Sequence, residues 1–165
     1  MVRRMPDQNV DIVRELYRSI QWLFDDDAGD AMRLGIDDPA AAIRDFPKVG
    51  HVVGFMTEDV TWKTVFAPEP VIGREAVVQL ISEWMEVMAQ WRVVDEVFTD
   101  VAKDVVLGDV KAVQSGRESG VPIEQPLFIT YTMRDGRIAR YWEFFTRDEA
   151  LASLEPPGGE HAPSR

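Results

Sequence analysis

A short turn near the end of the chain limits its fold more than any other feature. Asp135-Gly136 separates two runs rich in aromatic and β-branched residues, and this dipeptide is typical of a tight β-hairpin. The sequence therefore predicts an antiparallel pair whose last strand covers residues 137–145. Side chains alternate along a strand, so each face receives every second residue. One face carries Ala139, Tyr141, Glu143 and Phe145, and the other carries Ile138, Arg140, Trp142 and Phe144.

Charge and cysteine content limit the partners and the compartment. The 165 residues include 29 acidic and 18 basic ones, and the formal net charge of −11 repels nucleic-acid phosphates and anionic membrane surfaces. We therefore expect no nucleic-acid partner and no membrane association. The chain has no cysteine, which excludes disulfides and thiolate metal sites and is compatible with the cytoplasm. Residues 1–6 carry charge with no apolar run after them, so no secretory signal is expected.

Helical spacing marks the first half of the chain. Apolar residues recur at three- and four-residue steps over about residues 9–25 and again from Val77 to Met88. Pro47 suits the first turn of a short helix. The polar, alanine-containing segment 31–46 has room for another short helix, and a last one is expected over residues 148–154.

Strand-like runs dominate the second half, where no long helical pattern follows. Helices first and an antiparallel meander afterwards predict an α+β fold with the helices on one face of a curved sheet. We expect one domain over residues 9–154, with an N-terminal arm at 1–8 and a disordered tail at 155–165. The expected strands cover residues 60–66, 91–99, 104–117, 122–133 and 137–146.

A family resemblance is carried by four stretches of sequence. They are "MTEDVTW" (56–62), "IGREAVVQLISEW" (72–84), "DGRIARYWEFF" (135–145) and "TRDEALASL" (146–154). Together they resemble the SnoaL-like branch of the nuclear transport factor 2-like (cystatin-like) superfamily, which also contains ketosteroid isomerase, limonene epoxide hydrolase and scytalone dehydratase. The resemblance implies a cone: a curled mixed sheet wraps around N-terminal helices, and an apolar pocket opens between them. The segment 31–46 is then a candidate lid.

The resemblance to ketosteroid isomerase is partial at the site. That enzyme uses a tyrosine donor, an aspartate base and a protonated carboxyl donor. The tyrosine matches Tyr17, whereas the base falls near Lys63 and the second donor at Ile129. The resemblance therefore does not imply steroid-type isomerisation by that set of groups.

Limonene epoxide hydrolase suggests a different acid. Its carboxylic acid on the last strand falls on Glu143, while its arginine and aspartate partners fall on Val110 and Ala112. This register implies an apolar pocket that suits a small hydrophobic ligand. The expected pocket residues are Tyr17, Trp22, Trp62, Phe66, Val110, Ala112, Gln114, Ile129, Tyr131, Ala139, Tyr141 and Phe145.

Our first hypothesis is a cofactor-free and metal-free enzyme, an isomerase, cyclase, dehydratase or hydrolase, for an apolar polyketide-, terpenoid- or aromatic-type substrate. Glu143 transfers the proton, and Tyr17 or Tyr141 donates a hydrogen bond to the developing oxyanion. His51 is a further candidate for proton chemistry. Because desolvation disfavours a carboxylate, an inward-facing Glu143 should have a raised pKa.

The alternative hypothesis is a non-catalytic module of the same fold that binds a hydrophobic ligand or dimerises. Glu143 is then structural, either at the pocket mouth or paired with Arg140 or Arg92. The apolar residues of the outer face also predict a homodimer, because such a surface is poorly solvated. These residues are Ile138, Trp142 and Phe144.

Overall fold

The structure is a computed structural model that describes residues 7–24 and 37–155. Residues 1–6 of the predicted arm and 156–165 of the predicted tail lie outside these residues, and residues 7–8, also assigned to the arm, begin the first helix. The helices are α1 (Asp7–Phe24), α3 (Pro39–Asp45), α4 (Pro47–Gly54), α5 (Arg74–Val87) and α6 (Arg147–Ala152). The strands are β1 (Met56–Lys63), β2 (Val71–Ile72), β3 (Met88–Ala102), β4 (Val105–Gly116), β5 (Pro122–Arg134) and β6 (Arg137–Phe144).

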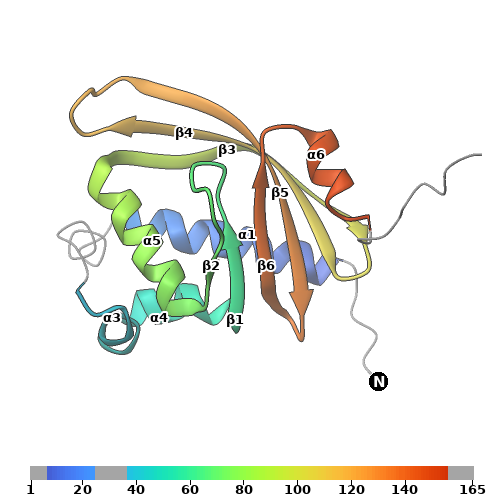
Figure 1. The fold of residues 1–165 in the computed structure, drawn as a ribbon, viewed down its shortest axis with the longest axis horizontal. Helices are drawn as coiled ribbons and strands as arrows, with labels where there is room; N and C mark the ends of the chain where they lie inside the picture. The colour runs from blue at the N-terminus through green and yellow to red at the C-terminus, as the bar shows by residue number, and fades with distance from the viewer. Residues whose placement is uncertain (1–6, 25–36, 156–165) are drawn as a thin grey trace, which may run out of the picture.

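The strands form one curled, unclosed sheet in the order β2-β1-β6-β5-β4-β3. The predicted antiparallel meander of β3 to β6 is confirmed, and β1 adds to β6 in parallel, which makes the sheet mixed. Figure 1 shows the long β3–β4 hairpin extending over α5 and α1, and α6 packs against β5 and β6. The fold is therefore α+β, as expected. Among the described residues no helix combines the length and the apolar character needed to cross a bilayer.

The turn between β5 and β6 has the geometry that its sequence predicts. Asp135 and Gly136 both have positive φ, 52° and 80°, which is the conformation that favours these residue types in a two-residue hairpin. This turn sets Tyr131 opposite Tyr141 and Ile129 opposite Glu143. The register thus places these four predicted site residues on one face of the sheet.

A β-bulge corrects the predicted faces of β6. Met133 pairs with Ile138 but Thr132 pairs with Arg140, so Ala139 is an extra residue on this strand. The alternation restarts at the bulge, and Ile138 points into the core with no exposed surface. The expectation that Ile138 belongs to the outer face is therefore wrong, and so is the expectation that Ala139 continues the inner row.

The first strand also differs from its predicted range of 60–66. It begins at Met56, where parallel pairing with Ile138 of β6 supplies a partner, and it ends at Lys63. Beyond this point the amide of Val65 donates its hydrogen bond to the Glu143 carboxylate instead of to a neighbouring strand. Side-chain chemistry at the site thus contributes to the end of this strand.

The segment 31–46 is described only in part. Its expected short helix is α3, which begins at Pro39 after the side chain of Asp38 accepts a hydrogen bond from the Ala41 amide at 3.1 Å. Residues 25–36 lie outside the described residues, and with them most of the candidate lid.

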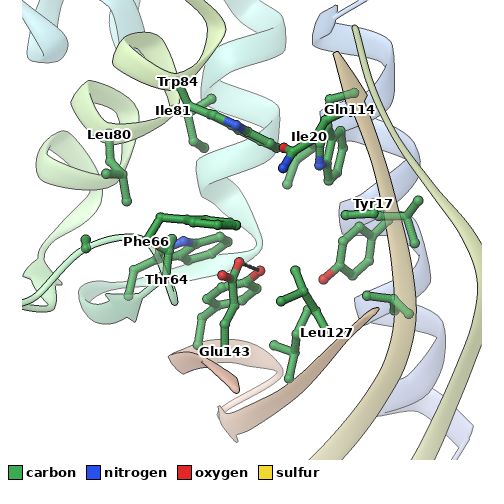
Figure 2. A pocket seen from close by; sticks show the side chains of 18 of the residues that line it. Tyr17, Ile20, Thr64, Phe66, Leu80, Ile81, Trp84, Gln114, Leu127 and Glu143 are labelled. Atoms are coloured by element: carbon green, nitrogen blue, oxygen red, sulfur yellow. Dashed lines mark hydrogen bonds between the residues drawn. The ribbon is translucent and has the colours of Figure 1, made fainter. Parts of the chain in front are cut away.

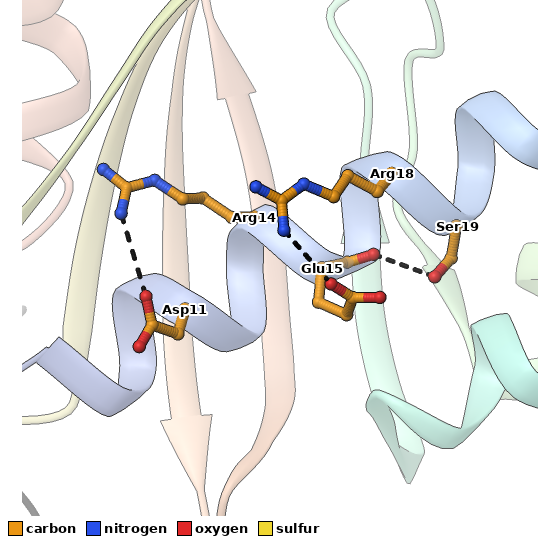
Figure 3. A network of polar contacts seen from close by, with 5 residues as sticks. All are labelled: Asp11, Arg14, Glu15, Arg18 and Ser19. Atoms are coloured by element: carbon orange, nitrogen blue, oxygen red, sulfur yellow. Dashed lines mark hydrogen bonds and ion pairs between the residues drawn. The ribbon is translucent and has the colours of Figure 1, made fainter.

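Helix α1 has two chemically different faces. Its outer face carries the ion pairs Asp11–Arg14 at 3.7 Å and Glu15–Arg18 at 3.5 Å, all of whose side chains are substantially exposed (Figure 3). Exposed pairs of this kind contribute little to stability. Packing of the inner face against the sheet therefore holds the helix, and that face directs Tyr17 inward, where it is only 6% exposed.

The bulge predicts a large stability effect at Ile138. We expect Ile138→Ala to lower the free energy of unfolding by about 2–5 kcal/mol, because it leaves a cavity in a filled core. The matched control is Ile72→Ala, whose side chain is 68% exposed and should change stability by about 0.5 kcal/mol or less. Urea denaturation compares the two variants. Equal small losses would return Ile138 to the outer face.

Candidate functional site

A cavity of about 280 Å³ opens between the curled sheet and the helices α1 and α5 (Figure 2). Its wall is mostly aliphatic and aromatic, and Phe66, which is 65% exposed, stands at its mouth. An enclosed apolar wall with few polar groups is typical of sites for small hydrophobic molecules. The lining residues are Tyr17, Ile20, Trp62, Thr64, Phe66, Ala67, Leu80, Ile81, Glu83, Trp84, Trp91, Val93, Val110, Ala112, Gln114, Leu127, Ile129, Tyr141 and Glu143.

Glu143 is held in the cavity wall by two hydrogen bonds. The Tyr141 hydroxyl donates to its Oε1 at 2.6 Å, and the Val65 amide donates to its Oε2 at 3.0 Å. Tyr141 is in turn fixed by stacking on Trp62, with ring centroids 3.6 Å apart and planes 6° apart. Both bonds come from groups with little freedom, so the carboxylate keeps one orientation.

Burial sets the protonation of this carboxyl. Desolvation raises the pKa of Glu143 above its ordinary value of 4.5, while the bonds from Tyr141 and Val65 and the charge of Lys63 act in the opposite direction. The ion pair with Arg140 or Arg92, which the alternative hypothesis offered for Glu143, is not formed. Arg140 lies over the Trp142 ring at 4.1 Å, and no ion pair joins Glu143 to a cation among the described residues. Desolvation therefore outweighs the stabilising contacts.

A second polar group faces the same space from α1. The hydroxyls of Tyr17 and Tyr131 are hydrogen-bonded to each other, and Figure 2 shows the Tyr17 hydroxyl directed into the cavity. Burial raises the pKa of Tyr17, Tyr131 and Tyr141, so all three phenols remain protonated at neutral pH. Protonated phenols are hydrogen-bond donors, so the cavity presents donors beside one carboxyl group.

Most of the predicted pocket residues line this cavity. They come from α1, β1, the segment after β1, and the inner rows of β4, β5 and β6. The inner row of β4 follows from strict alternation, which directs every second residue from position 106 inward. The predicted residues in the wall are Tyr17, Trp62, Phe66, Val110, Ala112, Gln114, Ile129, Tyr141 and Glu143.

Five predicted residues lie elsewhere. Trp22 is 50% exposed and carries the Lys48 ammonium 4.0 Å from its ring centroid. His51 is exposed on α4 with its ring against Phe55, away from Glu143 and the cavity wall. Phe145 follows the end of β6 and is 51% exposed. Tyr131 lies behind Tyr17, and Ala139 is displaced by the bulge.

Sequence reasoning missed the wall contributed by α5 and β3. The helical spacing identified Leu80, Ile81 and Trp84 as an apolar face, but periodicity alone does not separate a packed face from one that lines a cavity. Trp91 and Val93 fell in the strand expected over residues 91–99, but neither was assigned to the pocket. Among the described residues no group of three His, Asp or Glu side chains has the geometry of a metal site.

The Tyr141 bond predicts a directed pKa change. Tyr141→Phe removes a bond that favours the ionised form, so the pKa of Glu143 should rise further above 4.5. Tyr131→Phe is the matched control, because the Tyr131 hydroxyl bonds to Tyr17 and not to Glu143. Carboxyl titration by NMR measures both. A fall of the pKa in Tyr141→Phe would contradict the assigned bond.

Linkage gives the sign of a stability effect. The folded-state pKa of Glu143 exceeds its unfolded value, so the folded chain binds this proton more tightly. The resulting stability is fully present below the unfolded pKa and is lost as the pH rises through the folded pKa. Glu143→Gln should therefore gain stability relative to the wild type over that rise in pH. Denaturation at several pH values tests this, with Glu83→Gln at the mouth as the matched change.

Several solved structures have the same architecture as this chain. A candidate polyketide cyclase from Xanthomonas campestris pv. campestris has a TM-score of 0.64 at 15% identity, covering 89% of this chain and 96% of that chain. A candidate SnoaL-like polyketide cyclase from Jannaschia sp. CCS1 has a TM-score of 0.58 at 21% identity, covering 95% and 100%. An LEH-like epoxide hydrolase from M. tuberculosis has a TM-score of 0.59 at 12% identity, covering 90% and 90%. At these identities the likeness shows the fold alone.

Sequence comparison supplies the family. No curated protein matches the sequence. The SnoaL-like domain pattern, in contrast, matches residues 23–141, which is well over half of the chain. The resemblance expected from the four stretches is thereby confirmed, and the chain belongs to the SnoaL-like domain family of the nuclear transport factor 2-like superfamily.

Proposed function

We propose that this protein is a cofactor-free enzyme that performs general acid–base chemistry on an apolar aromatic, polyketide- or terpenoid-type substrate. The observation that carries the proposal is the Glu143 carboxyl, oriented by Tyr141 and Val65 in an apolar cavity and raised in pKa by burial. A base whose pKa approaches the working pH exchanges protons most efficiently. An apolar wall also strengthens every electrostatic interaction inside it.

The proposed step is proton removal next to a carbonyl. Glu143 takes the proton, the C–H electron pair forms a carbon–carbon double bond, and the carbonyl electrons move to its oxygen as an enolate. The Tyr17 hydroxyl, whose pKa is raised by burial, stays protonated and donates to that oxygen. If the enolate is conjugated to a further double bond, return of the proton from Glu143 to the far carbon gives isomerisation. Attack of the enolate carbon on a second carbonyl gives cyclisation, and the oxygen of that carbonyl takes the proton back from Glu143.

One observation favours the alternative of a non-catalytic ligand-binding module. Both oxygens of Glu143 already accept hydrogen bonds from the protein, which also suits a structural carboxylate that fixes the segment after β1. Each carboxylate oxygen has a second lone pair, so these bonds leave room for a proton from a ligand. The two functions differ in turnover and not in geometry.

Proton exchange separates them. We expect the wild type to accelerate deuterium uptake at the α-carbons of 2-tetralone, an apolar bicyclic ketone, when followed by NMR. Glu143→Gln should lower this acceleration by about 10²–10⁴-fold, the range for a general base. Glu83→Gln is the matched control, because it makes the same change at an exposed residue of the cavity mouth. Binding of 2-tetralone without exchange would favour the binding module.

The homodimer remains a proposal, and the bulge in β6 changes the surface through which it would form. With Ile138 in the core, the outer face of β6 offers the partly buried Trp142 and Phe144 to a second copy of the chain. We expect sedimentation at about 10 µM to give the mass of two chains, and Phe144→Asp to give the mass of one. A monomeric wild type at this concentration would contradict the dimer.

A further inference from the structure

Gln114 is a buried amide at the end of an otherwise apolar row. It follows Val110 and Ala112 on the inner face of β4, where alternation directs its side chain into the cavity. Only 6% of its surface is exposed. Its amide makes no hydrogen bond to any other residue in the described ranges 7–24 and 37–155. Buried amides are normally paired, because an unpaired one loses its bonds to water without replacement.

The surroundings of Gln114 offer flat aromatic surfaces. Trp91 is its cross-strand partner on β3, and Trp84 of α5 meets the Trp91 ring edge-on at a centroid distance of 5.0 Å. Both tryptophans line the cavity. A planar ring of a ligand can pack here with a polar substituent next to the amide.

Gln114 and Glu143 belong to opposite ends of the cavity, as Figure 2 shows. Glu143 pairs with Ile129, which pairs with Gly108 on β4. Gln114 follows Gly108 by six residues, roughly 20 Å along an extended strand, which the curl of the sheet and the reach of both side chains shorten. One elongated ligand can therefore contact both groups.

The charged side chains of the cavity wall limit which chemical groups the ligand can have. Its lining residues include the carboxyls of Glu83 and Glu143 and no lysine or arginine within the described part of the chain. The Lys63 ammonium, whose charge reaches Glu143, lies outside this lining and donates to the carbonyls of Ala67 and Pro68. Phosphates and carboxylates therefore meet no cation in the described wall itself. A neutral amide both donates and accepts, so it suits a hydroxyl or a carbonyl oxygen.

We propose that Gln114 is a specificity-determining residue that binds a neutral oxygen at the far end of the substrate. The substrate is thus an elongated, uncharged aromatic ketone, with the reacting carbonyl at Glu143 and a hydroxyl or second carbonyl at Gln114. This inference rests on the proposed use of the cavity for a small ligand, and it names the substrate class of that site.

The first test uses the ligand-free protein. Gln114→Met has a similar volume and removes an amide that has no partner, so its melting temperature should equal or exceed that of the wild type. The matched control is Gln125→Met on β5, whose amide donates to the Pro126 carbonyl at 3.0 Å outside the cavity. A clear fall in melting temperature for Gln114→Met, beyond that of the control, would assign the amide a structural role and overturn the proposal.

The second test uses ligand pairs that differ by one oxygen. The shorter pair is 2-tetralone and 6-hydroxy-2-tetralone, and the longer pair is 4-acetylbiphenyl and its 4′-hydroxy derivative. For at least one pair, calorimetry with the wild type should show about fivefold tighter binding of the hydroxylated member, the effect of one hydrogen bond. Gln114→Met should lose this gain and Gln125→Met should keep it.

The outcomes separate this inference from the proposed function. The role of Gln114 is overturned if the wild type binds neither hydroxylated ligand more tightly than its partner, or if Gln114→Met keeps the tighter binding. The result of the exchange assay does not change this conclusion. Glu143-dependent exchange with no such gain leaves the catalytic proposal intact. A Gln114-dependent gain without exchange supports the role of Gln114 and contradicts catalysis.

Discussion

The hydrogen bond from the Val65 amide to the Glu143 carboxylate joins the two parts of the molecule on which the site depends. The amide belongs to the segment that follows β1 and leads to Phe66 at the cavity mouth. The carboxylate belongs to β6, which lies between β1 and β5 in the sheet. The bond fixes the direction of the carboxyl group and opposes part of the pKa rise caused by burial. Position and acidity of Glu143 therefore have a common origin in the meeting of these two segments.

The cavity wall is largely apolar, so each of its few polar groups interacts strongly with a ligand. In a wall rich in tryptophan, valine and leucine side chains, the polar groups on which the proposals rest are the Glu143 carboxyl, the Tyr17 phenol and the Gln114 amide. Electrostatic interactions are stronger there than in water, and an unpaired polar group is correspondingly costly. In the proposed function, Glu143 and Tyr17 act on a reacting carbonyl, and in the further inference Gln114 binds a distant oxygen. These proposals place recognition of the distant oxygen on β4 and the chemistry on β6 and α1.

The family resemblance bears differently on fold and on chemistry. The architecture matches SnoaL-like proteins across the whole described domain. At the site, the positions that resemble the arginine and aspartate of limonene epoxide hydrolase hold Val110 and Ala112, and both line the cavity. An apolar pair there leaves Glu143 without a charged partner on β4. This arrangement is the reason why the proposed function uses one carboxyl group and not a coupled set of the epoxide hydrolase type.

The sequence by itself determined the last hairpin, the two long helices and the antiparallel meander. Asp135-Gly136 defined the hairpin and helical spacing located α1 and α5, because these signals act over a few residues. The register implied by the family resemblance placed Val110, Ala112 and Gln114 in the cavity, where all three lie. Tertiary structure alone decided the rest. The bulge at Ala139 depends on how β6 pairs with β5, the bond from Val65 depends on a contact across 78 residues, and the exposure of Trp22 and His51 depends on how the helices pack. Such features follow from long-range contacts, which local periodicity does not encode.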